Sequence, residues 1–304
     1  MDPIPARQRI EMLFDSFEEL ALADGLTDPI GFPGYQQTLD SAPGEAIVWG
    51  IGRVGTHRVV AALFEFSFLG GSMGDVVGAT LEAAMSRALT DGLSFLAVTA
   101  SGGARMQEGM FALAQMPRAV SASVALAAAG IPRITILGHP TTGGVYASFA
   151  SLSDILLADQ GATIGFAGPR VAEAVAGAPL PEHSHTAEAA YEHGLIDAVV
   201  PPQMMRDRLT LLLNILAPAI PQDVPQMDTT SVNVGDAWEE YLLARHAERP
   251  TNSVHTSNLF DQVFEFHGDR MGNDDPGVIT ALVRFAERPV VLIALNRTHP
   301  NASG

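Results

Sequence analysis

Two glycine pairs in this sequence, each set between an apolar run and a helical pattern, have residue types that can bind an anionic oxygen. Residues 101–105 read SGGAR after the apolar run 93–100, and residues 140–144 read PTTGG after the apolar run 131–139. Glycines leave backbone amides uncovered, and the first turn of a helix has unpartnered N–H groups in a dipole that favours negative charge. Two such turns can form an oxyanion hole, in which each donor is worth about 3 kcal/mol. Alternatively, the glycines only permit tight turns or close helix packing.

Other side chains are weaker candidates for chemistry. His183 and His185 lack further His or carboxylate residues at metal-ligand spacing, which favours an exposed polar loop and no metal site. Ser101 lacks the G-x-S-x-G elbow of a nucleophilic serine. Three arginines are candidates for contact with a ligand phosphate, with an ordinary ion pair as the alternative: Arg105, Arg118 and Arg170.

Composition excludes several function classes. The 304 residues include 17 basic and 34 acidic side chains, for a net charge of −17, and none of the basic ones is lysine. This excludes a lysine Schiff base and a P-loop lysine, and the absence of cysteine excludes disulfides and thiolate-bound metal. The acidic balance argues against nucleic-acid or anionic-membrane binding. With no signal peptide or membrane-spanning run, we expect a soluble, cytoplasmic protein.

Strand and helix patterns alternate through the first two thirds of the chain. Residues 7–22 have apolar side chains at helical spacing, and two apolar stretches, 46–52 and 58–68, predict a hairpin. Helices are expected over 74–89, from the first glycine pair to about 129, and over 145–152. Strands are expected at 93–100, 131–139, 154–159 and 162–168. Repeated strand–turn–helix units predict an α/β architecture.

The last third begins with a proline-rich polar stretch, residues 217–234, that we interpret as a linker between domains 1–216 and 235–304. Helices are expected over 235–247 and 254–266. Residues 278–285 and 289–296 then predict a second hairpin that repeats the first. We interpret residues 235–304 as the truncated beginning of a second, similar domain, and a finished C-terminal arm is the alternative.

Long motifs of the chain resemble the carboxyltransferase of bacterial acetyl-CoA carboxylase. Four of them, with the stretch 191–197, resemble its β subunit over about residues 5–215: FLGGSMG (68–74), SGGARMQEG (101–109), PTTGGV (140–145) and IGFAGPRV (164–171). Four others resemble the start of its α subunit: LARH (243–246), RPT (249–251), FHGDR (266–270) and DDP (274–276).

The resemblance implies a crotonase-like (ClpP/crotonase) ββα spiral for each half, with carboxyl transfer from carboxybiotin to the α-carbon of an acyl-CoA. It assigns the enolate oxyanion hole to backbone amides of Gly102, Gly103, Gly143 and Gly144. It implies that the acyl-CoA, a CoA thioester, contacts these residues: Gly71, Ser72, Met73, Arg105, Met106, Phe166, Ala167, Gly168 and Arg170.

By the same resemblance the carboxybiotin is carried on a separate protein, the biotin carboxyl carrier protein, which is charged by biotin carboxylase. Such a carboxyltransferase would be a dimer of β–α units or would need a complementing α subunit. It would supply malonyl-CoA for fatty acid or polyketide synthesis within an ATP-dependent complex. A biotin-independent malonyl-thioester decarboxylase and a non-catalytic assembly subunit are the alternatives.

Three departures from the family pattern bear on these expectations. The four-cysteine zinc ribbon usual in the β subunit is absent, so no zinc is expected. Residues 78–80 read GAT in place of Gly-Glu-Lys, and residues 182–185 read EHSH in place of Glu-Gly-Phe-Gln. The last two lie where they can shape substrate choice, which makes acyl-CoA a firmer expectation than acetyl-CoA.

We predict that the protein binds no stoichiometric zinc and no nucleic acid, because it lacks cysteine and carries a charge of −17. Elemental analysis of the purified protein and a titration with RNA at physiological salt measure both. One zinc per chain, or submicromolar RNA affinity, would contradict the prediction.

Overall fold

Contacts within the computed structural model divide the chain into two units. The structure describes all residues except 43, 182, 219–235, 247, 249 and 296–304. The predicted linker, residues 217–234, therefore lies almost entirely outside the described residues. The first unit comprises residues 1–210 and 267–274, and the second comprises residues 211–266 and 275–304. Residues 267–274, which we had placed in the second domain, thus group with the first unit.

The first unit is built on an eight-stranded mixed sheet in the order β1-β2-β3-β4-β5-β6-β8, with β7 paired to β5. The two pairs β1–β2 and β2–β3 are antiparallel, and the strands from β3 onward are parallel to one another. The strands are β1 (Ser16–Glu19), β2 (Ile47–Val54), β3 (His57–Phe64), β4 (Phe95–Ser101), β5 (Arg133–Thr142), β6 (Ile155–Asp159), β7 (Ile164–Gly165) and β8 (Ala198–Val200).

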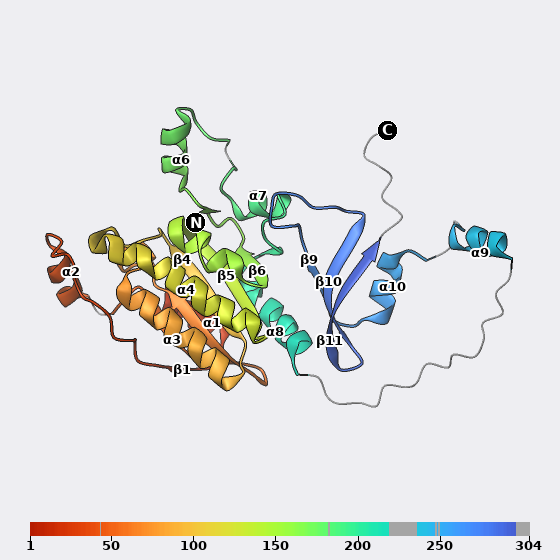
Figure 1. Cartoon of the computed structure of the whole chain (residues 1–304), viewed down its shortest axis with the longest axis horizontal. Helices are drawn as coiled ribbons and strands as arrows, with labels where there is room; N and C mark the ends of the chain where they lie inside the picture. The colour runs from red at the N-terminus through yellow and green to blue at the C-terminus, as the bar shows by residue number, and fades with distance from the viewer. Residues whose placement is uncertain (43, 182, 219–235, 247, 249, 296–304) are drawn as a thin grey trace. The chain divides into compact units, whose positions relative to one another are not determined.

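Helices connect the parallel strands. The α-helices of this part are α1 (Ala6–Leu13), α2 (Tyr35–Ser41), α3 (Asp75–Asp91), α4 (Met110–Ala128), α5 (Gly143–Ala147), α6 (Pro169–Ala176) and α7 (Ala187–Glu192), and α8 (Met205–Leu216) contributes residues to both units. Short 3₁₀ turns are η1 (Leu69–Gly71), η2 (Met106–Glu108), η3 (Ala150–Leu152) and η4 (Pro202–Met204). The long helices α3 and α4 run side by side (Figure 1), joined by a bond from Arg118 to Glu82.

The continuous apolar runs form buried strands, as predicted. Every residue of β4 and of β6 is buried, because parallel strands are covered by structure on both faces. The predicted first hairpin is confirmed as β2 and β3, with a two-residue turn at Gly55 and Thr56. The predicted helix over 145–152 is shorter, since α5 ends at Ala147 and a 3₁₀ turn follows.

The predicted helix over residues 7–22 is wrong in its second half. Helix α1 ends at Leu13, and Ser16–Glu19 form the edge strand β1, whose residues pair with β2 from Arg53 to Gly50. The ring of Phe17 lies 5.3 Å from that of Phe14 across this break. Apolar residues three and four apart fit a helix, but hydrogen bonds to a distant strand favoured the extended form here.

The second unit repeats the start of the first. It contains α9 (Ala237–Ala244), α10 (Asn252–Leu259) and a three-stranded antiparallel sheet β9 (Val263–Phe266), β10 (Val278–Phe285) and β11 (Arg288–Leu295) in the order β11-β10-β9. Both hairpins have eight residue pairs and a two-residue turn, and each is preceded by a four-residue strand. The prediction of a second, similar hairpin is confirmed. The predicted helix over 254–266 is wrong at its end, where VFEF forms β9.

Helix α4 is long and apolar enough, by length and composition alone, to cross a membrane. Packed helices of soluble proteins pass the same test. Its Gln115 donates a hydrogen bond to Asp75 and its Arg118 to Glu82, so these two polar side chains of α4 have partners on α3.

We predict that the ion pair between Arg9 of α1 and Asp159 of β6 is the stronger of two arginine–carboxylate pairs made by α1. Both side chains are almost fully buried, whereas Arg7 pairs with Glu19 in solvent. Arg9→Met should lower the free energy of unfolding by about 3–5 kcal/mol, because it leaves an unpaired buried carboxylate. Arg7→Met should cost about 1 kcal/mol or less. Denaturation by urea, followed by circular dichroism, measures both, and equal losses would contradict the prediction.

Candidate active site

The structure brings the two predicted glycine turns together. Strands β4 and β5 are parallel neighbours, and Ser101 at the end of β4 pairs with Thr141 of β5. Their turns therefore emerge at the same edge of the sheet. A Cβ built on Gly103 would lie 3.2 Å from both Gly143 Cα and Gly144 N, so the turns are in direct backbone contact.

Three of the four predicted oxyanion-hole amides are bonded within the protein. The N–H of Gly102 donates to Gly70 O at 2.9 Å, and that of Gly143 donates to Phe166 O at 2.8 Å. The N–H of Gly103 donates to Ser101 Oγ at 3.0 Å. The expectation that all four amides face a substrate oxygen is therefore corrected. These three bonds hold the turns in place.

One amide donor remains free on each turn. Gly144 lies in the first turn of α5, where a helix offers its N–H no internal acceptor, and no other described residue accepts from it. The residues on either side of Ala104 are hydrogen-bonded to Met73 through their backbone groups. Because successive N–H groups of an extended segment point in alternate directions, the Ala104 N–H points away from Met73. It too has no acceptor in the described part of the chain. Ala104 is not among the candidate donors named in the sequence analysis.

The predicted substrate contacts Gly71, Ser72 and Met73 lie beneath the first turn. All three are buried, and Met73 is completely so. The Met73 N–H donates to Gly103 O at 2.8 Å, and the Arg105 N–H donates to Met73 O at 3.0 Å. These residues support the turn from inside, and their contact with acyl-CoA stays a prediction.

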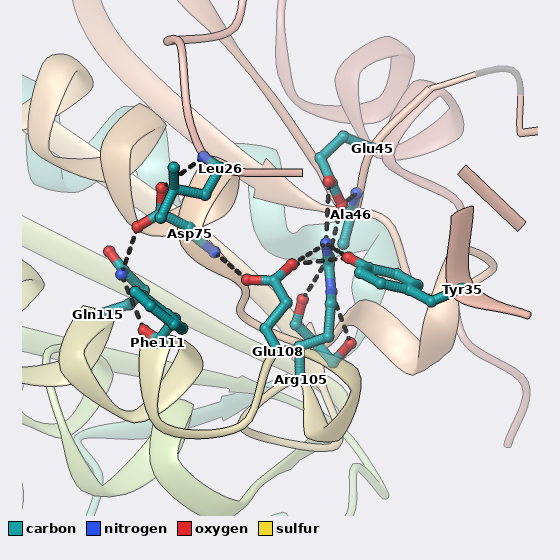
Figure 2. Close-up of polar contacts among 10 residues, drawn as sticks. Leu26, Tyr35, Glu45, Ala46, Asp75, Arg105, Glu108, Phe111 and Gln115 are labelled. Carbon is teal, nitrogen blue, oxygen red and sulfur yellow. Dashed lines mark hydrogen bonds and ion pairs between the residues drawn. The ribbon is translucent and has the colours of Figure 1, made fainter. Parts of the chain in front are cut away.

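Arg105 does not reach a ligand phosphate. Its side chain is fully buried and forms ion pairs with Glu45 and Glu108 (Figure 2). Its Nη2 also donates to Ser72 O at 2.8 Å, and its guanidinium lies 5.1 Å from the centre of the Phe68 ring. Burial by itself lowers the pKa of Arg105, but the bonds to Glu45 and Tyr35 raise it overall, so the charge persists. Sequence reasoning missed Tyr35 and Glu45, since neither stands in a recognisable motif.

The remaining predicted contacts lie nearer to solvent. Met106 is 73% exposed and Phe166 is 69% exposed, and the backbone of Phe166 holds Gly143. Ala167 and Gly168 are half-buried before α6. Arg170 on α6 is exposed and makes no ion pair with the described residues, which leaves its charge available to a ligand.

No metal centre emerges among the described residues, which contain no group of three His, Cys, Asp or Glu side chains suited to an ion. His185 instead shares a hydrogen bond of 2.8 Å with Ser184 Oγ.

We predict opposite tolerance to a methyl group at two of the glycines. Gly103 has φ +116°, and a Cβ there would press on backbone atoms, so Gly103→Ala should cost about 1–3 kcal/mol of stability. A Cβ on Gly144 would overlap only the flexible end of Met116. Gly144→Ala should therefore be nearly neutral in a Met116→Ala background. Thermal unfolding measures the cost of Gly103→Ala against the wild type and of Gly144→Ala against Met116→Ala, and equal costs of the two substitutions would contradict the prediction.

A known protein is similar to this chain over almost its whole sequence. Acetyl-coenzyme A carboxylase carboxyl transferase subunits beta/alpha of Salinispora arenicola is 41% identical over 321 residues, which cover 98% of this chain and 57% of that protein. The chain thus spans little more than half the length of this relative.

Two solved structures are similar over more than two thirds of this chain. Transcarboxylase 12S, with methylmalonyl-coenzyme A and methylmalonic acid bound, matches with a TM-score of 0.74 at 24% identity, covering 97% of this chain and 57% of that one. The Pseudomonas malonate decarboxylase hetero-dimer matches with a TM-score of 0.54 at 28% identity, covering 69% of this chain and 84% of that one.

The likeness to transcarboxylase 12S confirms the predicted crotonase-like fold. Residues 5–303 match the family of the carboxyl transferase domain. Since this match spans almost the whole sequence, the chain belongs to the carboxyl transferase domain family.

Proposed function

We propose that this chain is a carboxyltransferase component of a biotin-dependent acyl-CoA carboxylase. The observation that supports it most is the pair of free amides, on Ala104 and Gly144, at the junction of two turns in backbone contact. Two fixed N–H donors, one from each strand end, suit a thioester oxygen that becomes negative in an enolate. The relative's activity as an acetyl-coenzyme A carboxylase transferase is consistent with this.

In the proposed reaction the α-carbon of the acyl-CoA loses a proton and gains a carboxyl group. Carboxybiotin, a substrate carried on a separate protein, supplies the carboxyl group, and its ring nitrogen takes up the proton. The chain's own part is to hold the thioester so that the enolate oxygen meets the amides of Ala104 and Gly144. The exposed Met106, Phe166 and Arg170 would contact the CoA portion.

The partners and setting follow as parts of the same proposal. A biotin carboxyl carrier protein and biotin carboxylase would act with the chain in an ATP-dependent complex, as a dimer of β–α units or with a complementing α segment. Transcarboxylase 12S, the structural neighbour, is described as a hexamer. We further propose a cytoplasmic enzyme that supplies malonyl-CoA for fatty acid or polyketide synthesis.

A biotin-independent decarboxylase of malonyl thioesters is the second candidate, because the malonate decarboxylase hetero-dimer shares this fold at 28% identity. It would use the same free amides for the enolate but would protonate the α-carbon after loss of CO₂. The two candidates differ in whether a biotin acceptor is required.

We predict that malonyl-CoA loses its carboxyl group only when a biotinylated carrier is present to accept it. The assay combines the chain with the remaining portion of the carboxyltransferase that its relatives contain, and follows acetyl-CoA formation with and without the carrier. In the Met116→Ala background, Gly144→Val should lower kcat/KM by about 10²–10³-fold relative to Gly144→Ala, because its branched side chain would overfill the space beside Met116 and displace the donor N–H. Turnover without carrier would favour the decarboxylase, and full activity of Gly144→Val would contradict the assigned donor.

A further inference from the structure

The buried side chain of Arg105 connects the first glycine turn to the segment before β2 through hydrogen bonds. Its guanidinium donates through Nη1 to Tyr35 Oη at 3.1 Å and to Glu45 Oε2 at 2.9 Å, and it bonds the other oxygen of Glu45 through Nη2. Arg105 thus binds Glu45 in the bidentate arrangement that arginine makes with carboxylates. Figure 2 shows Glu45 above the guanidinium, Tyr35 to its right and Glu108 to its left. Tyr35 and Glu45 lie 60 residues or more before Arg105 in sequence.

Tyr35 extends the same network to the start of α3. Its hydroxyl donates to Glu108 Oε1 at 2.6 Å, and the other oxygen of Glu108 accepts from the Asp75 N–H at 2.6 Å. Tyr35 is 2% exposed, and burial together with its bond to Glu108 raises the pKa of its hydroxyl. The phenol therefore stays a neutral donor between a carboxylate and a guanidinium.

The network has little freedom to rearrange. One positive charge and two negative charges lie in a region that water barely reaches, since the side chains of Arg105, Glu108 and Glu45 are 0%, 1% and 9% exposed. Removing one partner from such a cluster leaves a buried charge unpaired, which costs far more than breaking a surface pair. The position of the guanidinium is consequently determined by Tyr35 and Glu45 as well as by Glu108.

The position of the guanidinium in turn sets that of the free amide on Ala104. Arg105 follows Ala104 directly, and its backbone and side chain bond the main chain of both Met73 and Ser72. A shift of the guanidinium would move this extended segment and the Ala104 N–H with it. Small displacements of a donor matter, because an oxyanion hole acts only where donors meet the developing charge.

We propose that Tyr35 and Glu45 are positioning residues for the oxyanion-binding turn, acting through Arg105. Both bond the side chain of Arg105 at the end of the first glycine turn, and neither belongs to the motifs that carry the family resemblance. The inference rests on the proposed function for its catalytic consequence. Its structural part, that these two side chains order residues 101–106, stands independently of which reaction is catalysed.

The structural part is tested by hydrogen–deuterium exchange of the full chain. In Tyr35→Phe and Glu45→Gln, the amides within residues 101–106 should exchange about tenfold faster, the size expected for the loss of a charge-assisted hydrogen bond. The amides of β6 should be unchanged. Glu19→Gln, which breaks the exposed pair with Arg7, is the matched control and should leave both segments unchanged. Unchanged exchange in residues 101–106, or equally faster exchange across the whole first unit, would overturn the proposal.

The catalytic part is tested by steady-state kinetics of the complete carboxyltransferase. Tyr35→Phe and Glu45→Gln should lower kcat about tenfold while KM for malonyl-CoA stays within twofold, because donor alignment changes and CoA contacts do not. Arg105→Lys keeps the buried charge but lacks the planar guanidinium that binds Glu45 through two nitrogens. This variant should fold and should show the same loss of kcat. An unchanged kcat in all three variants, or a loss that appears only in KM, would refute positioning. An inactive wild-type enzyme would refute the proposed function alone, and the exchange result would still decide the structural part.

Discussion

Arg105 carries a full positive charge into a part of the molecule that water does not reach, and the arrangement around the candidate site follows from how that charge is neutralised. Glu108 approaches from the same loop, and Glu45 approaches from the chain before β2. Because an unpaired buried charge is strongly destabilising, these segments must close on the guanidinium together. The glycine turn between β4 and Arg105 is held as part of that closure.

Pairs between an arginine and a buried aspartate recur at other points where distant segments meet in the first unit. Arg9 of α1 bonds Asp159 at the end of β6, and Arg270 bonds Asp197 beside β8. Burial raises the pKa of both aspartates, and the facing guanidinium opposes that rise. Arginine suits this role, because its planar fork makes several directed bonds and its charge is retained on burial. Because the sequence has no lysine, arginine is the long basic side chain available for pairing with these aspartates.

The repeated strand arrangement places the two hairpins in different surroundings. In the first unit β3 pairs with the parallel strand β4, and its residues from Val59 to Phe64 are buried. In the second unit the described residues pair β11 only with β10, and Val291 and Ile293 are 59% and 71% exposed. The same local pattern therefore yields a core strand or an exposed edge strand, depending on which strand lies beside it.

The sequence by itself determined the elements whose signal is local: the apolar runs of β4 and β6, the two hairpins, and the glycine pairs that follow β4 and begin α5.

Only the tertiary structure decided that residues 16–19 form a strand, because their hydrogen-bond partners lie on β2. It also decided which amides are free. The acceptors of Gly102 and Gly143 are the carbonyls of Gly70 and Phe166, more than twenty residues away. Likewise, Arg105 reads as a candidate phosphate ligand in sequence, since Glu45, one of the two carboxylates that pair with it, lies 60 residues earlier. Partners of this kind leave no trace in spacing or periodicity, so their assignment required the folded chain.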